Sequence, residues 1–299
     1  MCSRRSVRPI NVQPTLLALS TPRLSNYTPY FGVSDDFDLY ACYQWNNELS
    51  RSFLPILHLI EVSLRNAYHK ILSLHFSSLM SSSYPWYGCI NLSAKSKKEV
   101  DKALRKTNRP DDVISRQTFG FWLNLPDTKG VPWEIIHKEV FPYSSRNWKK
   151  LPNQDWLYAR IKMINDLRNR IAHWEPIWKI GPLFEEARDR SGRHLLQQLA
   201  PATVSPAESI FRLNMYYDRM RSLLSLINPD LVNTYEDSYT HEHLSWICSM
   251  QGLKTYRAST RNRTITVSQF KRCLNSAIKS KNLITISLKG EPCARLMPL

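Results

Sequence analysis

Three side chains near the middle of the sequence, Arg168, Asn169 and His173, have types and a spacing that suit chemistry. On an ideal helix Asn169 and His173 share a face, whereas Arg168 and His173 lie about 140° apart around the axis. The pair can serve one site if Arg168 reaches around the helix or if the helix ends near His173. Pro176 favours such an end, because proline disfavours helical geometry at the preceding residue and lacks a backbone donor.

These side chains suit RNA cleavage without a metal ion. The imidazole of His173 can take a proton from a ribose 2′-hydroxyl or give one to the leaving 5′-oxygen, since histidine titrates closest to neutrality. Arg168 stays charged and offers a planar fork to phosphate oxygens, and Asn169 can orient either group or bind the substrate. The reaction uses one base and one acid, which a two-fold dimer that faces two motifs would supply.

The same side chains also suit an ordinary helix end. Arg168 can interact with the C-terminal carbonyls of the helix and His173 can cap them, because cations stabilise helix C-termini. Taken alone, an arginine and a histidine at this spacing favour the capping interpretation.

A second polar set, Glu61, Arg65 and Asn66, lies on the first long helix that the sequence predicts. Glu61, Arg65 and His69 follow at four-residue steps and share one helix face, which an ordinary surface ion pair explains. In the functional alternative, Glu61 or Arg65 enters the polar centre of a helical bundle and orients the later motif. The site would then be assembled from two helices.

Two other patterns have simpler explanations than a binding site. His241 and His243 are two residues apart, so they point away from each other on a helix, and no third metal ligand accompanies them. The chain has no glycine-rich phosphate loop, so we expect neither a metal nor another cofactor. Six tryptophans could stack on nucleobases, although most of them fit a core better: Trp122, Trp133, Trp148, Trp156, Trp174 and Trp178.

The positive charge of the chain lies at its two ends. The 299 residues include 41 basic and 25 acidic side chains, for a formal net charge of +16. Residues 1–30 contribute +4 and residues 254–299 contribute +9, which leaves the centre nearly balanced. Such an excess is typical of proteins with a polyanionic partner. The candidate RNA-binding residues are Lys254, Arg257, Arg261, Arg263, Lys271 and Arg272.

Cysteine spacing and apolar runs indicate the compartment. The six cysteines are scattered without a C-x-x-C pair, as expected of thiols in a reducing compartment. No apolar run approaches the roughly 18 residues that span a bilayer, and no apolar segment with a cleavage site follows the arginine-rich start. We expect a cytoplasmic protein without a membrane partner.

Helical periodicity predicts an all-α body. Residues 1–33 show no sustained period and should form a flexible basic arm, mobile or loosely docked. From Asp36 one apolar stripe marks a long helix, and Pro55 should break it near residues 52–54. The residues of the stripe are Phe53, Leu57, Ile60, Leu64, Tyr68 and Ile71.

Further helices are expected over residues 93–105, 112–125, 153–174, 182–199 and 206–227. Asn153 is a plausible N-cap, and Asp155 in the first turn would complement the helix dipole. The body should run from residue 34 to residue 229. The basic extension over 230–299 has mixed signals, with a helix over 241–253, strand-like runs over 264–267 and 283–288, and an ambiguous stretch over 268–280.

Residues 167–177, which read LRNRIAHWEPI, resemble the signature of the Abi-like proteins of bacteria (abortive infection, AbiD/AbiF-type), which belong to the HEPN superfamily of helical nucleases. A second block lies about a hundred residues earlier, as in that family. It comprises Tyr43, Trp45, Asn46, Leu49 and the run from Leu59 to Asn66, with its Glu61 and its Arg65-Asn66 pair.

The resemblance implies a HEPN-like helical bundle, a homodimer and a metal-independent endoribonuclease with the motif R-x(4–6)-H. Arg168 and His173 match the two motif positions, and Asn169 matches the polar residue after the arginine. The resemblance covers residues 36–228. Pro55 in the first helix and Trp174, where a further histidine is frequent, depart from the pattern.

The leading hypothesis is an RNase toxin of bacterial phage defence that uses His173 and Arg168, supported by Asn169 and Glu61. One alternative is a non-catalytic RNA-binding module, which the basic ends of the chain favour. The other is a toxin of a toxin–antitoxin pair, held inactive by a regulatory RNA or protein on the basic extension.

Overall fold

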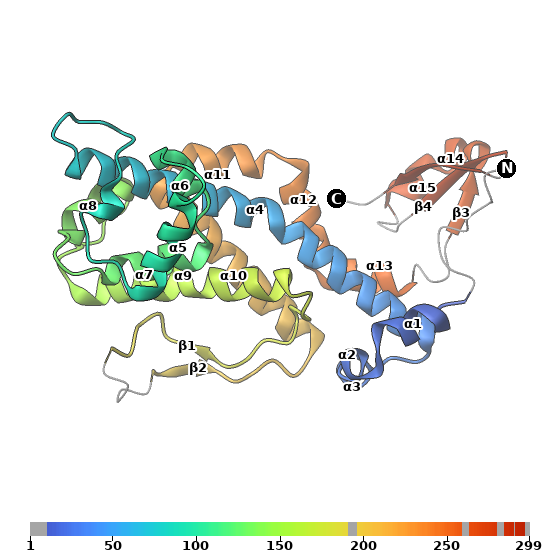
Figure 1. The fold of residues 1–299 in the computed structure, drawn as a ribbon. Helices are drawn as coiled ribbons and strands as arrows, with labels where there is room; N and C mark the ends of the chain where they lie inside the picture. The colour runs from blue at the N-terminus through green and yellow to red at the C-terminus, as the bar shows by residue number, and fades with distance from the viewer. Residues whose placement is uncertain (1–10, 191–195, 259–262, 280–283, 290, 297–299) are drawn as a thin grey trace.

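The computed structural model describes residues 11–190, 196–258, 263–279, 284–289 and 291–296, and in these ranges the chain is mostly helical. Figure 1 shows one long helix, α4, that crosses the molecule, with shorter helices packed along it and two small sheets at the periphery. The all-α prediction for the body of the chain is confirmed. No described helix combines the length and the apolar composition that crossing a bilayer needs.

The core forms around α4 (Asp36–Phe76), which is 41 residues long. Its start is fixed by Asp35, whose carboxylate accepts a hydrogen bond from the Asp38 amide at 2.9 Å. The stripe expected from the sequence is buried, apart from the half-buried Ile71. Helices α8, α9, α10, α12 and α13 all pack against α4.

The expected break near residues 52–54 is wrong, because α4 continues through Pro55. Phe53, Ile56 and Leu57 around the proline are buried, so packing holds this turn in helical geometry. The carbonyl of Arg51 lacks the amide that another residue at position 55 would provide. Since Arg51 is exposed, water can satisfy that carbonyl.

Short helical segments fill the chain between α4 and α9. They are η1 (Trp86–Gly88), α5 (Ala94–Leu104), α6 (Pro110–Ser115), α7 (Phe119–Asn124), η2 (Leu125–Asp127) and α8 (Trp133–Val140). The expected helix over 93–105 is α5, and Ser93 caps it by accepting from the Ser96 amide at 3.2 Å. The helix expected over 112–125 is divided, because the Gln117 side chain donates to the Val113 carbonyl at 2.7 Å and ends α6.

The other two long helices are α9 (Leu151–Ala172) and α10 (Pro206–Ile227), and α10 spans the residues expected. The N-cap predicted for α9 is wrong: Asn153 lies inside the helix and donates to the Asn147 carbonyl at 2.8 Å. Pro152 in the first turn explains the earlier start, since proline suits that position. Asp155 lies beyond the first turn and forms an ion pair with Arg190 at 2.7 Å.

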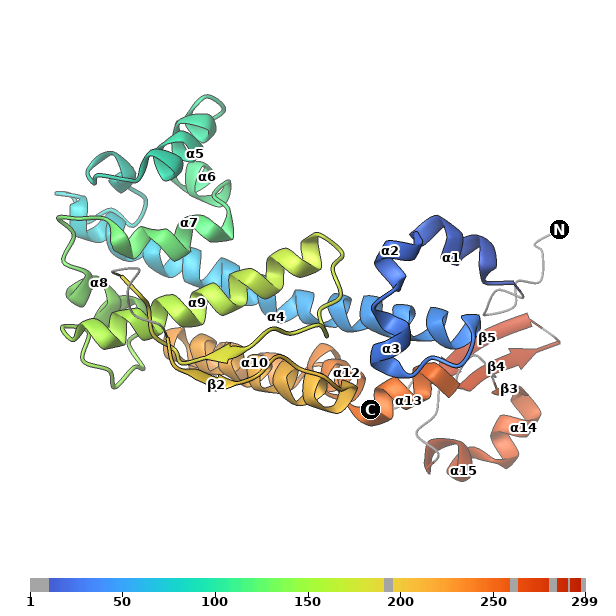
Figure 2. The same cartoon turned by 90° about the horizontal axis from the view of Figure 1, so that it is seen from below.

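The helix expected over 182–199 is wrong, because its described residues form an antiparallel hairpin. Strand β1 (Leu183–Phe184) pairs with β2 (Gln198–Ala200). Glu186 next to β1 bonds the buried Arg160 of α9 at 2.5 Å, and this tertiary contact draws the segment onto the bundle. Figure 2 shows the hairpin running along α9 and α10.

The segment before α4 is docked on the core through three helices: α1 (Gln13–Leu19), α2 (Thr21–Leu24) and α3 (Tyr27–Phe31). The rings of Tyr27 and Phe31 lie 5.0 Å and 4.9 Å from that of Trp178, which follows α9. This docking differs from the mobile or loosely docked arm expected from the sequence. Residues 1–10 of that arm lie outside the described ranges.

The main core continues past residue 229 through α11 (Pro229–Glu236), α12 (Tyr239–Ile247) and α13 (Met250–Ala258). Its last buried member is Leu253, so the helical body extends beyond the expected boundary. The single helix expected over 241–253 is divided between α12 and α13.

A second, small cluster follows, formed by β3 (Arg263–Thr266), α14 (Val267–Arg272), α15 (Leu274–Lys279), β4 (Ile284–Leu288) and β5 (Glu291–Leu296). Strand β3 is parallel to β4, which is antiparallel to β5. The two strand-like runs are confirmed as β3 and β4. The ambiguous stretch is helical as far as Lys279, so the extension does mix helix and strand.

Candidate functional site

Arg168, Asn169 and His173 lie together at the C-terminal end of α9. Arg168 and Asn169 are half-buried, and Arg168 Nη1 donates to Asn169 Oδ1 over a long 3.5 Å. The helix ends at Ala172, and the exposed His173 is its C-cap with φ −91°. The helix end predicted from Pro176 is therefore confirmed.

Backbone amides satisfy the last carbonyls of α9. The amides of residues 173–175 donate to the carbonyls of residues 169–171 at 2.9–3.1 Å. Two of these bonds form a Schellman motif, with Trp174 at φ +57° in the left-handed position where glycine is usual. In the described part of the chain, neither Arg168 nor His173 caps the helix through its side chain. The capping interpretation therefore does not account for these two residues.

The chain after His173 is held by α2 and α4. Arg23 of α2 donates from Nη1 to the Trp174 carbonyl at 2.7 Å. Asn46 of α4 is buried, and its Oδ1 accepts from the Ile177 amide at 3.0 Å. The role of Asn46 was not predicted, although an amide in the apolar stretch beside Trp45 is a detectable signal.

Arg170 holds the same loop from α9. Its guanidinium donates to the Pro176 carbonyl and lies 3.6 Å from the Glu175 carboxylate. Burial lowers the pKa of Arg170, and the nearby Glu175 opposes this shift. Arg170 therefore acts on the loop, whereas Arg168 bonds only its neighbour Asn169 among the described residues.

The second predicted set, Glu61, Arg65 and Asn66, lies on α4. Arg65 Nε donates to Asn66 Oδ1 at 3.3 Å. Within the described ranges no hydrogen bond or ion pair links this set to α9.

His69, on the face of Glu61 and Arg65, belongs to a buried network. Trp86 Nε1 donates to His69 Nδ1 at 2.9 Å, so His69 Nε2 carries a proton and donates to Asp111 at 3.1 Å. Burial lowers the pKa of His69 despite the carboxylate. These bonds give His69 a structural role.

Arg257, one of the six candidate RNA-binding residues, is part of the fold. Its guanidinium bonds Asp38 at 2.5 Å and 2.7 Å and donates to the Phe31 and Gly32 carbonyls at 2.9 Å and 3.3 Å. It therefore joins α13 to α3 and α4. Burial opposes ionisation of Asp38, but the hydrogen bonds and charge of Arg257 and the hydrogen bonds from Ser34 together lower the Asp38 pKa. These contacts give Arg257 a structural role, and its contact with RNA stays a prediction.

Four of the other candidate cations lie on α13, β3 and α14. Lys254 is exposed on α13, and Lys271 and Arg272 are exposed at the end of α14. Arg263 lies in β3, and Arg261 is outside the described residues.

A basic surface that the sequence analysis underrated lies on α5 and the turn after it. Residues 94–109 contain seven basic and two acidic side chains, and all seven basic residues are exposed. They are Lys95, Lys97, Lys98, Lys102, Arg105, Lys106 and Arg109. In Figure 2, α5 and α6 project from the same side of α4 as the C-terminal end of α9. The near balance of the whole central region had concealed this local excess.

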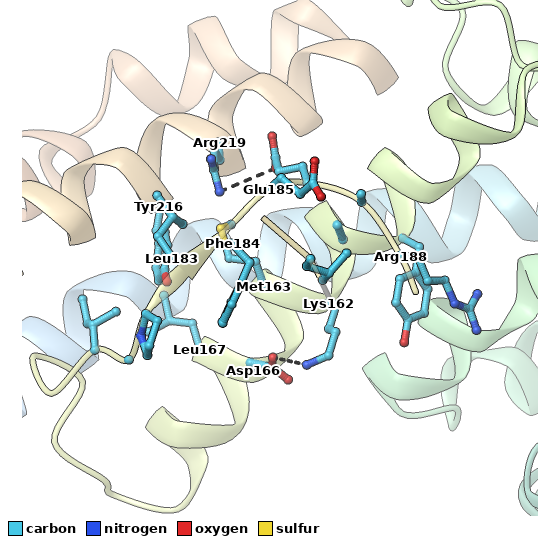
Figure 3. A pocket seen from close by; sticks show the side chains of 18 of the residues that line it. Lys162, Met163, Asp166, Leu167, Leu183, Phe184, Glu185, Arg188, Tyr216 and Arg219 are labelled. Atoms are coloured by element: carbon cyan, nitrogen blue, oxygen red, sulfur yellow. Dashed lines mark hydrogen bonds and ion pairs between the residues drawn. The ribbon is translucent and has the colours of Figure 1, made fainter. Parts of the chain in front are cut away.

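A cavity of about 520 Å³ lies between α9, α10 and the β1–β2 hairpin (Figure 3). Several of its charges are matched by neighbours: Lys162 bonds Asp166 at 2.5 Å, and Arg219 lies 3.7 Å from Glu186. Arg188 at the other end bonds Asp127 of η2 at 2.5 Å. The pairs of Glu186 and Arg188 tie the hairpin to the bundle, so we do not place the candidate site here.

The two histidines of α12 bond different elements. His241 Nδ1 lies 2.5 Å from the Tyr217 hydroxyl, and His243 Nε2 bonds Glu48 of α4 at 3.1 Å. The hydrogen bond with His243 lowers the Glu48 pKa. Both histidines therefore help to fix α12 on its neighbours.

Neither a protein family model, nor a curated protein, nor a solved structure matches this chain. The Abi-like resemblance therefore depends on residues 167–177 and on the first block alone.

Proposed function

We propose that this chain is a metal-independent endoribonuclease of the HEPN type. The observation that carries the proposal is the end of α9, where backbone amides satisfy the helix carbonyls and Arg170 and Arg23 hold the following loop. Arg168 and the exposed His173 remain available to a substrate beside this end. A cation for phosphate and an imidazole for proton transfer are two of the groups that RNA cleavage uses.

In the proposed reaction, His173 takes the proton of a ribose 2′-hydroxyl, and the 2′-oxygen attacks the adjacent phosphorus. The bond from phosphorus to the 5′-oxygen breaks, and an acid protonates that oxygen. The products are a 2′,3′-cyclic phosphate and a 5′-hydroxyl. Arg168 stabilises the charge on the phosphate oxygens, and Asn169 positions Arg168 through their contact. We propose that the His173 of a second copy supplies the acid in a homodimer.

The cellular role that we propose is that of an RNase toxin in bacterial abortive infection. It follows from the resemblance of residues 167–177 and of the first block to Abi-like proteins. The exposed cations on the C-terminal extension, Lys271 and Arg272, would suit a regulatory RNA.

The test is cleavage of RNA in EDTA by wild type, His173→Ala and Arg168→Ala, with end-group analysis of the products. We expect wild type to leave 2′,3′-cyclic phosphates and both variants to lose most activity, about 100-fold or more. His75→Ala is the matched control, because His75 is also exposed but lies at the far end of α4. Equal cleavage by wild type, His173→Ala and Arg168→Ala, or a need for added metal, would overturn the proposal.

A second candidate function, a non-catalytic RNA-binding module, is favoured by the basic surface of α5. On this hypothesis RNA binds with a strong salt dependence and is not cut. Charge reversal of Lys97, Lys98 and Lys102 should then remove binding, while His173→Ala should change nothing.

A further inference from the structure

Trp174 is an exposed aromatic side chain on a fixed backbone. It has 67% of its surface exposed, whereas Trp122, Trp133, Trp148 and Trp178 are buried. Its φ of +57° is rare for a bulky side chain, because the left-handed region crowds its Cβ. Arg23 donates to the Trp174 carbonyl and Arg170 donates to the Pro176 carbonyl, while Asn46 accepts from the Ile177 amide. These hydrogen bonds hold this loop. An exposed indole on a strained backbone, beside His173, is typical of a binding surface rather than of a packed core.

A cavity of about 510 Å³ opens beside this indole, between the end of α9 and one face of α4. Its apolar wall is made by Trp174, Ile171 and Leu54. The wall on α4 is polar, because Gln44, Asn47, Glu48 and Arg51 recur there at helical spacing. The cavity therefore combines flat apolar surface with polar groups on one side.

The polar wall has groups that are free to bind a ligand. Within the part of the chain that the structure describes, the half-buried amides of Gln44 and Asn47 have no hydrogen-bond partner. Arg51 has 78% of its side chain exposed and only a 3.5 Å contact with Glu48. Amides offer a donor and an acceptor together, as the edge of a nucleobase requires, and an exposed guanidinium suits a phosphate.

We propose that this cavity binds a nucleobase of single-stranded RNA, stacked on Trp174 with its edge toward Gln44 and Asn47. The inference deepens the proposed function and rests on it for the identity of the ligand as substrate. The strand must be single, because a duplex keeps its bases stacked and paired. A second hollow of about 450 Å³ shares Arg51 and Leu54 and leads along α4 toward α12, which leaves room for a neighbouring nucleotide.

The experiment measures binding of an oligoribonucleotide of about ten nucleotides to the full chain carrying His173→Ala, which prevents the proposed cleavage. Trp174→Asn tests the stacking, because asparagine tolerates the left-handed conformation. We expect binding about 5- to 150-fold weaker, the range for one lost base stack. Trp174→Phe should retain most of the affinity but lose the quenching of indole fluorescence that RNA causes.

Tyr143→Ala is the matched control. Tyr143 is also exposed, at 61%, and precedes the opposite end of α9, so its removal should leave binding unchanged. The double variant Gln44→Ala, Asn47→Ala should alter the preference among homopolymers. Thermal unfolding of each variant shows whether the fold is retained.

Unchanged binding by a folded Trp174→Asn variant would overturn the base site. A change from dimer to monomer in the same variant would also overturn it, because the indole would then lie in an interface between two copies. If Trp174→Asn with His173 intact cleaves RNA as well as wild type does, the base-site proposal is overturned and the endoribonuclease proposal is retained. If RNA binding depends on Trp174 but wild type does not cleave RNA, the base-site proposal is retained and the endoribonuclease proposal is overturned.

Discussion

Replacing His137 by leucine should remove a defined part of the acid sensitivity of the fold. His137 lies in α8 with no exposed surface, stacked on Trp133 at 5.6 Å and edge-on to Trp148 at 5.3 Å. Neither ring nitrogen has a hydrogen-bond partner among the described residues. Burial therefore lowers the pKa of His137 from 6.5 to about 4.

The direction of the pH effect follows because His137 binds its proton more tightly in the unfolded chain than in the folded chain. The stability that comes from a neutral His137 is complete above pH 6.5 and is lost as the pH falls toward about 4. At about 1.4 kcal/mol per pH unit, the fold should lose about 2 kcal/mol between pH 8 and pH 5 through this residue alone. The full loss near pH 4 is about 3 kcal/mol.

The assay is urea unfolding of wild type and His137→Leu at pH 8 and pH 5. The pKa of His69 is also lowered, so the wild type has other acid sensitivity, and only the difference between the two proteins isolates His137. That difference should change by about 2 kcal/mol between the two pH values. The control is Ile135→Ala, an exposed neighbour on α8 that does not titrate, which should shift stability equally at both.

An equal loss of free energy in wild type and His137→Leu would refute this reasoning. Since α8 packs on α4, acid unfolding would also remove the proposed RNA cleavage without any change in the chemistry at His173. Measurements of activity against pH that test His173 should therefore be made above pH 6.5, where this loss of stability does not occur.

Three further predictions concern the frame of the site. Gly252→Ala should destabilise the fold by about 1–3 kcal/mol, because a Cβ would lie 2.5 Å from the Trp246 carbonyl. The control Gly120→Ala should cost little, since the nearest contact of its Cβ would be 3.9 Å away. Urea unfolding measures the stability of both variants. Pro55→Ala should stabilise α4 by about 1–3 kcal/mol by restoring a helix amide, and an unchanged unfolding midpoint would contradict this. Arg257→Ala should cost about 1–3 kcal/mol at neutral pH by leaving Asp38 without its cation, and limited proteolysis should then cut before α4. That cost should fade as the pH drops below about 4, because protonated Asp38 no longer needs Arg257.

Local periodicity predicted the elements whose stability is local or depends on one continuous stripe. The helix over 206–227 was predicted at its observed bounds, because proline at its start and a regular apolar face agree. Predictions failed where a distant partner decides the geometry. The hairpin after Pro182 depends on the bond between Glu186 and Arg160, which no local pattern contains.

Pro55 shows the same limit in the opposite direction. The local rule for proline was sound, but helices from many parts of the chain pack against α4, and buried neighbours hold the turn in place. The docking of α1–α3 likewise depends on Trp178 and Arg257, which lie far away in the sequence.

At the motif, the sequence predicted where α9 ends but not the Schellman turn that follows His173. A five-residue step separates Arg168 and His173 around an ideal helix by about 140°. His173 is the C-cap, so its backbone is no longer set by α9 alone but also by the Schellman turn that follows. That turn is fixed by Arg23 from α2, Asn46 from α4 and Arg170 from α9 itself. The relation between the two motif residues is thus a tertiary property, and Trp174, with its left-handed backbone, lies at the centre of the turn that sets it.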